Sequence, residues 1–189
     1  RVLQKTTFTF DASVWEFFAP LAVGAPVILA RPGGEKDSAY LVDAIRQHGI
    51  TVLQTVPAVL RALLLEPSLS ACNALRYVVV GGEALDWAIA HDLATCLPQA
   101  HLGNYYGPTE CSDVATSIDV AALAEAPGPV PIGRPIANAR VHVLDAHIQP
   151  VPVGVAGELY IGGAGVGRGY LTLPARTDER LLPVRFVPG

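Results

Sequence analysis

The segment Tyr106-Gly107-Pro108-Thr109-Glu110 combines side chains that suit the binding of a nucleotide. Glycine followed by proline makes a tight and stiff turn. An aromatic ring that can stack on a planar base precedes this turn. A hydroxyl and a carboxylate follow it, and these groups can meet a phosphate and its magnesium ion. Because loops that follow strands bind ligands in α/β proteins, the segment is a candidate site, although an ordinary surface turn would also fit it.

A second segment, Phe10 to Glu16, places the acid Asp11 among bulky aromatic residues. One interpretation is a helix start, with Asp11 or Ser13 as the N-cap. The other is the wall of a pocket, in which a partly buried carboxylate needs a positive partner because an unpaired buried charge is very costly. The ammonium group of a substrate would supply that partner.

A third segment, Gly157 to Leu171, is rich in glycine and follows a strand-like pattern. Glycines in this position can cradle a phosphate or open a dinucleotide-binding helix. The spacing is not that of the dinucleotide motif, and Pro174 comes too early for the helix that this motif requires. The pattern therefore favours a loop whose glycines allow tight turns and close backbone approach.

Alternating strand and helix patterns must position these segments. The sequence predicts buried strands at 25–30, 50–55 and 76–80, and helices at 38–48, 57–65 and 87–97. Ser38 and Asp86 are the predicted N-caps of the first and last of these helices. Such alternation is typical of an α/β fold with a mostly parallel sheet flanked by helices.

The pattern changes near residue 127, where prolines and glycines form a stretch that resembles a linker. Beyond it, residues 140–143 and 158–161 alternate as antiparallel strands do. We therefore divide the chain into an α/β part, residues 1–126, and a small antiparallel β-rich part, residues 127–189.

Composition excludes several classes of function for this chain of 189 residues. The formal net charge is −4 and no basic run occurs, so binding to nucleic acid is not expected. No apolar run reaches the roughly 18 residues that a membrane span needs, so no membrane partner is expected. Three widely spaced cysteines lack metal-site spacing and favour reduced thiols, as in the cytoplasm. The chain has no methionine and begins within a strand-like pattern, so we expect a piece of a longer protein.

Taken together, four segments resemble successive core motifs of the adenylation domains of nonribosomal peptide synthetases. In chain order they are Phe10 to Glu16, Gly81-Gly82-Glu83-Ala84-Leu85, Asn104 to Glu110, and Gly157 to Leu171. The resemblance covers essentially the whole chain. It implies that the α/β part belongs to the large N-terminal subdomain of the adenylate-forming fold and that the β-rich part is a second subdomain of the same domain.

The resemblance also implies an activity. Such domains use ATP and Mg²⁺ to convert an amino acid into an aminoacyl-AMP with release of pyrophosphate. The aminoacyl group then passes to the phosphopantetheine thiol of a peptidyl carrier domain, in an assembly line that also contains condensation domains. In-line transfer of this kind depends on positioning and charge neutralisation more than on a nucleophile.

Residue by residue, the resemblance implies a role for each motif position. Asp11 would pair with the α-ammonium group of the substrate. Tyr106 would pack on adenine, with Asn104 and the backbone of Gly82, Glu83 and Ala84 nearby and with Gly107 making the turn. Thr109 would contact the α-phosphate, and Glu110 would hold magnesium; these two are the predicted catalytic residues. The side-chain pocket would be lined by Ala12, Trp15, Gln54, Val79, Gly81, Tyr105, Asp113 and Val114.

Three of the lining residues, Gln54, Tyr105 and Asp113, can form hydrogen bonds, which favours a substrate with a polar side chain. Two alternatives stay open: an acyl- or aryl-CoA ligase of the same superfamily, and a non-catalytic scaffold domain. The family's phosphate loop with its lysine, its ribose-binding aspartate motif and the lysine of its C-terminal lid have no counterpart in this chain. Lys5 and Lys36 do not stand where either family lysine would. We therefore expect the isolated chain to be inactive in adenylation.

Overall fold

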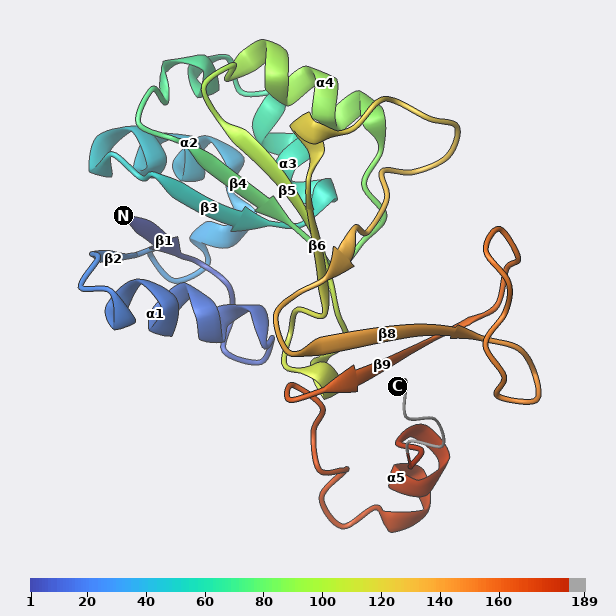
Figure 1. Cartoon of the computed structure of the whole chain (residues 1–189). Helices are drawn as coiled ribbons and strands as arrows, with labels where there is room; N and C mark the ends of the chain where they lie inside the picture. The colour runs from blue at the N-terminus through green and yellow to red at the C-terminus, as the bar shows by residue number, and fades with distance from the viewer. Residues whose placement is uncertain (184–189) are drawn as a thin grey trace. The chain divides into compact units, whose positions relative to one another are not determined.

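The computed structural model describes residues 1–183 and divides the chain into two compact units (Figure 1). Unit 1 comprises Arg1–Tyr106 and Ser117–Arg134, and unit 2 comprises Gly107–Thr116 and the residues from Pro135 onward. Residues 184–189, the end of the predicted β-rich part, lie outside the described residues. The division at residue 126, which we infer from composition, stays a prediction.

The elements follow the predicted alternation through most of unit 1. In chain order they are β1 (Val2–Gln4), α1 (Ala12–Ala22), β2 (Val27–Leu29), η1 (Gly34–Lys36), α2 (Ser38–His48), β3 (Val52–Thr55), α3 (Pro57–Leu64), η2 (Pro67–Ala71), β4 (Tyr77–Val80), α4 (Trp87–Cys96), β5 (His101–Tyr106), η3 (Thr109–Cys111), β6 (Thr116–Asp119), η4 (Val120–Ala122), β7 (Arg134–Pro135), β8 (Ala139–Leu144), β9 (Glu158–Gly163) and α5 (Pro174–Arg180).

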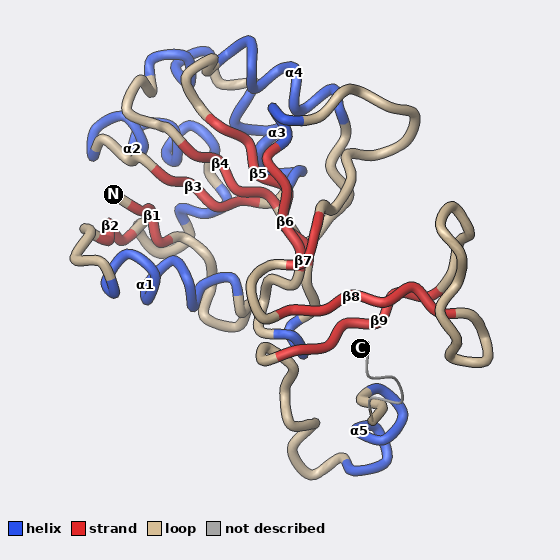
Figure 2. Tube along the Cα trace, viewed as in Figure 1, coloured by secondary structure: helices blue, strands red, loops and turns tan. Residues whose placement is uncertain are grey.

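The strands form a seven-stranded sheet in the order β2-β1-β3-β4-β5-β6-β7 and a separate pair, β8-β9 (Figure 2). Pairings β1-β2, β1-β3, β3-β4 and β4-β5 are all parallel. β8 and β9 are antiparallel, with Ala139 opposite Gly163. The predicted fold class, a mostly parallel sheet with helices followed by a small antiparallel part, is confirmed.

Helices α2, α3 and α4 cover one face of the sheet, where the main core lies (Figure 1). Side chains alternate between the faces of a strand, so Leu53, Val78 and Leu102 point into this core. Each of the three helices contributes leucine or isoleucine residues that are fully buried, such as Ile45, and this burial is the main stabilising term.

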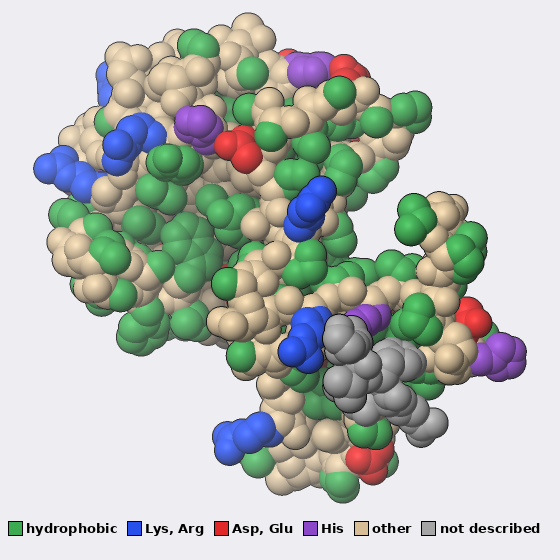
Figure 3. Space-filling view, in the orientation of Figure 1, with side chains coloured by type: hydrophobic (Ala, Val, Ile, Leu, Met, Phe, Trp, Pro, Cys, Tyr) green, Lys and Arg blue, Asp and Glu red, His purple; other side chains and the backbone are tan. Residues whose placement is uncertain are grey.

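Helix α1 packs on the other face, where its most extensive contacts with the sheet are to β1 and to the edge strand β2. On this face the alternate residues of β3, β4 and β5 are half-buried, as are Gln54 and Val79, or exposed, as is Tyr77. Hydrophobic side chains gather over the α1 region of the surface (Figure 3), where Phe8, Phe18 and Leu21 are exposed. We call this side of the sheet the open face.

The start of α2 differs from the prediction. Its N-cap is Asp37, whose Oδ1 accepts a hydrogen bond from the backbone N–H of Tyr40 at 3.0 Å, and Ser38 is the first helical residue. Asp86 is the N-cap of α4 as predicted, but its side chain pairs with Arg61 at 3.1 Å instead of bonding the helix backbone.

Within the described residues, no helix is long and apolar enough to cross a membrane.

We predict that Asp37→Ala lowers the free energy of unfolding by about 1 kcal/mol, because the substitution removes the cap of α2. The matched control is Asp43→Ala on the same helix, where the lost partner is the exposed Arg46 at 2.9 Å. An exposed pair of this kind contributes about 0.3–0.5 kcal/mol. Urea unfolding followed by circular dichroism measures both variants, and equal losses would contradict the capping role of Asp37.

Candidate functional site

Asp11 stands at the start of α1, where its Oδ1 accepts a hydrogen bond from the backbone N–H of Ala12 at 2.9 Å. The N-cap interpretation is therefore correct for this residue. Asp11 is half-buried, as are Ala12 in the first turn and Trp15 one turn later. The structure thus places the three predicted substrate-binding residues of this segment together at one end of α1.

Four of the predicted pocket residues meet on the open face, at the carboxyl ends of adjacent strands. Gln54 of β3 lies opposite Val79 of β4, which lies opposite Gly103 of β5. The ring of Tyr105 folds back over Gly103, since a Cβ there would come within 2.8 Å of its Cε1. Gly81 lies close to the backbone of Tyr105, because a Cβ added at Gly81 would be 2.7 Å from Tyr105 O. Parallel pairing therefore gathers Gln54, Val79, Gly81 and Tyr105 from distant parts of the sequence.

The side-chain oxygen of Gln54 is buried and accepts no hydrogen bond from residues 1–183. Leaving a buried carbonyl without a donor costs about 1–3 kcal/mol, so such an atom needs an explanation. Its place among the predicted pocket residues offers one, because a donor on a bound ligand would satisfy it. The sequence marks Gln54 as polar, but only the structure shows that its oxygen has no internal partner.

The loop Gly82-Glu83-Ala84 is held against the start of α3. Glu83 Oε2 accepts a hydrogen bond from the backbone N–H of Ala58 at 3.1 Å, in the first turn of that helix. A carboxylate is favourable there because the helix N-terminus carries partial positive charge. All three residues of the loop are exposed, so their backbone is accessible to a ligand.

Asn104 is buried, and its amide holds a neighbouring segment. Its Nδ2 donates to the carbonyl oxygens of Val130 at 3.2 Å and Pro131 at 2.9 Å. The backbone N–H of Val130 in turn donates to Leu85 O at 2.8 Å. Asn104 is thereby linked to Leu85, at the end of the Gly82–Ala84 loop, and the shared ligand of these residues stays a prediction. The neighbouring Tyr106, at the end of β5, is 37% exposed and accessible for stacking.

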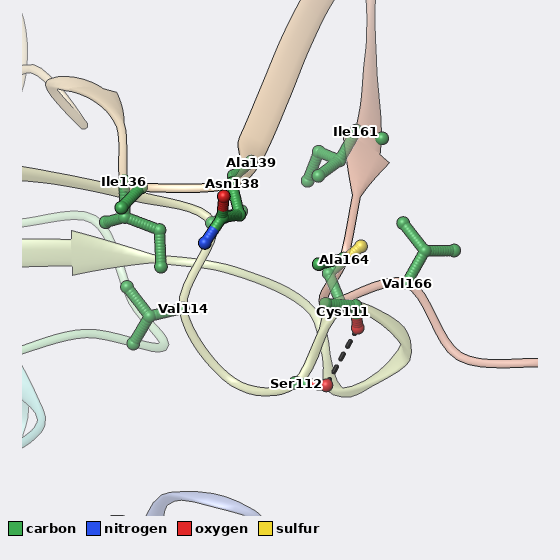
Figure 4. Close-up of a pocket in the computed structure, with 13 residues that line it drawn as sticks. Cys111, Ser112, Val114, Ile136, Asn138, Ala139, Ile161, Ala164 and Val166 are labelled. Atoms are coloured by element: carbon green, nitrogen blue, oxygen red, sulfur yellow. Dashed lines mark hydrogen bonds between the residues drawn. The ribbon is translucent and has the colours of Figure 1, made fainter.

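In unit 2, Thr109 and Glu110 belong to the short helix η3, and the glycine-rich loop after β9 packs against it. The backbone N–H of Gly167 donates to Glu110 O at 2.7 Å. Ser112 Oγ donates to Gly165 O at 2.7 Å, which is the dashed line in Figure 4. A Cβ on Gly165 would come within 2.8 Å of Cys111 O. The prediction that these glycines allow close backbone approach is confirmed.

The carboxylate of Glu110 accepts a hydrogen bond from the hydroxyl group of Tyr170 through Oε1. This bond is the main cause that lowers the pKa of Glu110, and the positive charges of Arg176 and Arg180 act in the same direction. The carboxylate is therefore ionised at neutral pH and is an oxygen donor suited to a hard cation. Sequence reasoning missed Tyr170, because 60 residues separate the partners and no spacing rule links them.

A cavity of about 280 Å³ lies within unit 2 (Figure 4). Val114, one of the predicted pocket residues, lines it together with Ile136, Ile161 and other mostly apolar residues. Asp113, the predicted neighbour of Val114 in the pocket, is not among the lining residues and has a left-handed backbone with φ of 75°. Val114 therefore borders this cavity and Asp113 does not, and their shared place in the substrate pocket stays a prediction.

The predicted site residues are divided between the two units. Unit 1 holds Asp11, Ala12, Trp15, Gln54, Val79, Gly81, Gly82, Glu83, Ala84, Asn104, Tyr105 and Tyr106, and unit 2 holds Gly107, Thr109, Glu110, Asp113 and Val114. Within the described residues, no group of three or more His, Cys, Asp or Glu side chains could hold a metal ion.

Residues 1–171 match the family described as AMP-binding enzyme. The chain belongs to this family. All of the chain aligns with phosphinothricin tripeptide synthetase PhsB of Streptomyces viridochromogenes at 47% identity. The chain spans 16% of that relative and only 13% of another relative, the indigoidine synthase of Dickeya dadantii.

Solved structures of the family agree with the fold. A crystal structure of the nonribosomal peptide synthetase FmoA3 matches with a TM-score of 0.89 at 28% identity, over 95% of this chain and 20% of that chain. The N-terminal subdomain of NpsA from Klebsiella oxytoca, in complex with 3-hydroxybenzoyl-AMSN, matches with a TM-score of 0.84 at 30% identity. That match covers 98% of this chain and 47% of the other. The chain thus shares the fold of these two structures over nearly all of its length.

We predict that Gly107→Ala disrupts the segment 107–116 of this family member. A Cβ at Gly107 would come within 2.4 Å of Asp113 O and 2.7 Å of Ala115 N, so the backbone must move. The matched control is Gly162→Ala in β9, where an added Cβ meets nothing within 4 Å. Amide hydrogen exchange should rise across 107–116 in the first variant and stay unchanged there in the second. Equal exchange in both would show that the close approach is unimportant.

Proposed function

We propose that the protein containing this chain activates an amino acid by adenylation for nonribosomal peptide synthesis. The substrate carboxylate attacks the α-phosphorus of ATP, pyrophosphate leaves, and an aminoacyl-AMP is formed. Support comes from membership of the AMP-binding family and from the similarity along the whole chain to peptide synthetases. An AMPPNP-bound form of FmoA3, with a TM-score of 0.88, supports the use of ATP.

The presence of Asp11 in the proposed pocket is the observation that supports an amino acid as the substrate. A ligase for fatty or aryl acids has no need for a carboxylate in this part of the pocket, whereas the α-ammonium group of an amino acid needs a negative partner. Asp11 is half-buried at the start of α1, with one oxygen held by a backbone N–H. Holding the carboxylate in this way fixes its direction before the substrate arrives, which reduces the cost of binding.

The nucleotide side of the proposed site uses the motif after β5. Tyr106 offers an exposed ring for adenine, and the exposed backbone of Gly82–Ala84 offers polar groups. Thr109 is exposed at the first position of η3, where its hydroxyl can donate to a phosphate oxygen. In this proposal these residues orient the nucleotide, and catalysis comes from positioning and charge stabilisation.

Glu110 fits the magnesium ion that such a reaction uses. Mg²⁺ is commonly held by one or two carboxylates together with the phosphates of its nucleotide, and Glu110 supplies an ionised carboxylate. When bound, the ion neutralises charge on the phosphates. The hydroxyl group of Tyr170 donates a hydrogen bond to one oxygen of the Glu110 carboxylate and so restricts the rotation of that carboxylate.

The proposal includes the later steps of an assembly line. The aminoacyl group passes to the phosphopantetheine thiol of a peptidyl carrier domain, and a condensation domain uses the product. We place the synthetase in the cytoplasm, where ATP is available and where the free thiols of Cys72, Cys96 and Cys111 stay reduced.

Amino-acid-dependent exchange of pyrophosphate into ATP tests the proposed reaction. We expect exchange with the full-length synthetase and none with the isolated 189-residue chain, which lacks the phosphate loop and the lysines of the family. Asp11→Asn should lower kcat/KM for the amino acid by about tenfold to a hundredfold, because a hydrogen bond to a charged group is lost.

The same assay separates the alternatives. Exchange driven by fatty or aryl acids, with CoA thioester formation and no effect of Asp11→Asn, would identify a CoA ligase. A full-length protein that shows no pyrophosphate exchange with any acid would be a non-catalytic scaffold. Robust exchange by the isolated chain would contradict the prediction that it is inactive.

We further propose an amino acid with a polar side chain that donates a hydrogen bond. The buried, unpartnered Oε1 of Gln54 supports this choice, together with the hydroxyl group of Tyr105 on the same face. A substrate without a donor would leave the Gln54 oxygen unpaired, which disfavours its binding.

Substrate profiling of Gln54→Leu tests this choice of substrate. The variant should lose activity with Gln, Asn or basic amino acids and gain relative activity with Leu, because the orphaned acceptor is replaced by an apolar group. Gln47→Leu, the same substitution at an exposed position of α2, should leave the profile unchanged. A wild-type preference for Leu or Phe would refute the polar substrate.

A further inference from the structure

The carboxylate of Glu16, in the second turn of α1, is fully buried with 0% exposure and is surrounded by hydrogen-bond donors. Oε2 accepts from the backbone N–H groups of Lys5 at 3.1 Å and Thr6 at 2.9 Å. Oε1 accepts from the hydroxyl group of Thr6 at 2.7 Å. Gln4 Nε2 lies 3.4 Å from Oε2 and adds a further contact. A buried carboxylate is tolerated only when it is satisfied in this way.

Lys5 supplies the opposite charge. Its ammonium group lies 3.4 Å from Glu16 Oε1, and its side chain is only 8% exposed. Burial lowers the pKa of Lys5, and the charge of Glu16 opposes this shift. Lys5 is one of two lysines in the chain, and the proposed reaction does not use it. The pair is therefore a charged cluster whose purpose the proposed chemistry leaves open.

The cluster joins α1 to the segment that connects it to β1. Glu16 on the helix binds the backbone of Lys5 and Thr6, which directly follow the strand. The rings of Phe8 and Phe17 add a second contact across the same connection, with centroids 5.5 Å apart. In the sequence, Asp11 lies between Thr6 and Glu16, which are joined by hydrogen bonds, and it is the N-cap of the helix. The position of Asp11 therefore depends on how the turn of α1 that carries Glu16 is held.

Stability alone does not account for such a cluster. Replacing a buried ion pair by apolar residues of similar size is often neutral or stabilising, because desolvation offsets the attraction between the charges. Hydrogen bonds differ from apolar contacts in being directional, so several bonds to one carboxylate fix the helix in rotation and along its axis. Oriented anchoring of this kind is useful where the end of a helix must present a functional group.

We propose that Glu16 is a positioning residue for the recognition of the substrate's α-ammonium group, with Lys5 and Thr6 as its partners. It holds α1 against the segment that follows β1, so that Asp11 meets the ammonium group at the correct distance and angle. The inference rests on the proposed function of Asp11 and assigns the residues that orient it. Glu16 itself does not touch the substrate.

Steady-state kinetics of Glu16→Gln in the full-length synthetase test this role. We expect KM for the amino acid to rise about tenfold, KM for ATP to stay unchanged, and the preference for the amino acid over its des-amino analogue to fall by a similar factor. A residue that only stabilised the fold would lower the amount of active enzyme and leave both KM values and this preference unchanged.

Further variants keep the test decisive if Glu16→Gln folds poorly. Thr6→Val removes one hydroxyl bond and keeps the charges, and it should shift the same parameters by a smaller factor. Lys5→Met combined with Glu16→Gln removes the unpaired ammonium and should recover stability without recovering the amino-acid KM. Asp43→Asn, on an exposed pair of α2, is the matched control and should leave both KM values and the des-amino discrimination unchanged.

The outcomes separate this inference from the proposed function. Wild-type exchange with an amino acid, combined with unchanged KM and unchanged des-amino discrimination in Thr6→Val and Glu16→Gln, would overturn the positioning role alone. A wild-type synthetase that does not adenylate amino acids would overturn the proposed function and this inference with it.

Discussion

Parallel pairing of β3, β4 and β5 in one register is the constraint on which the rest of unit 1 depends. Because Gln54, Val79 and Gly103 lie opposite one another, every alternate residue of the three strands shares a face. One face is buried under α2, α3 and α4, and the other is the open face with Gln54, Val79 and Tyr105. A shift by one residue would exchange core and pocket side chains, so the register that protects the core also assembles the candidate pocket.

Backbone contacts have the corresponding role in unit 2. The glycine-rich loop reaches η3 through Gly165 and Gly167. Gly165 leaves no room for a side chain beside Cys111 O, and Gly167 allows a close approach to Glu110 O. Thr109 and Glu110 are consequently supported by a segment more than fifty residues further along the chain, including the Tyr170 hydroxyl group. In both units, a candidate functional side chain is oriented by hydrogen bonds from a neighbouring segment. Glu16 serves α1 in the same way.

Much of the fold was predictable because its signals are local. Apolar runs bounded by glycine or proline mark β3 and β4, and Pro57 marks the start of α3. The sequence favours Ser38 as the N-cap of α2, whereas the structure has Asp37. Aspartate and serine at adjacent positions are both good caps, and only the backbone decides between them. Asp86 shows a related limit, since its pairing with Arg61 depends on the packing of α3 beside α4.

The family, the order of the motifs and the residues of the candidate site can be read from the sequence, because they depend on residue type and spacing along the chain. Tertiary structure decided which of these residues meet. It placed Val114 beside a cavity, and it left Gln54 Oε1 without a hydrogen-bond donor among residues 1–183. It also revealed the partnerships of Glu110 with Tyr170 and of Glu16 with Lys5. Such contacts join side chains through the packing of whole elements, and no local pattern in the sequence records them.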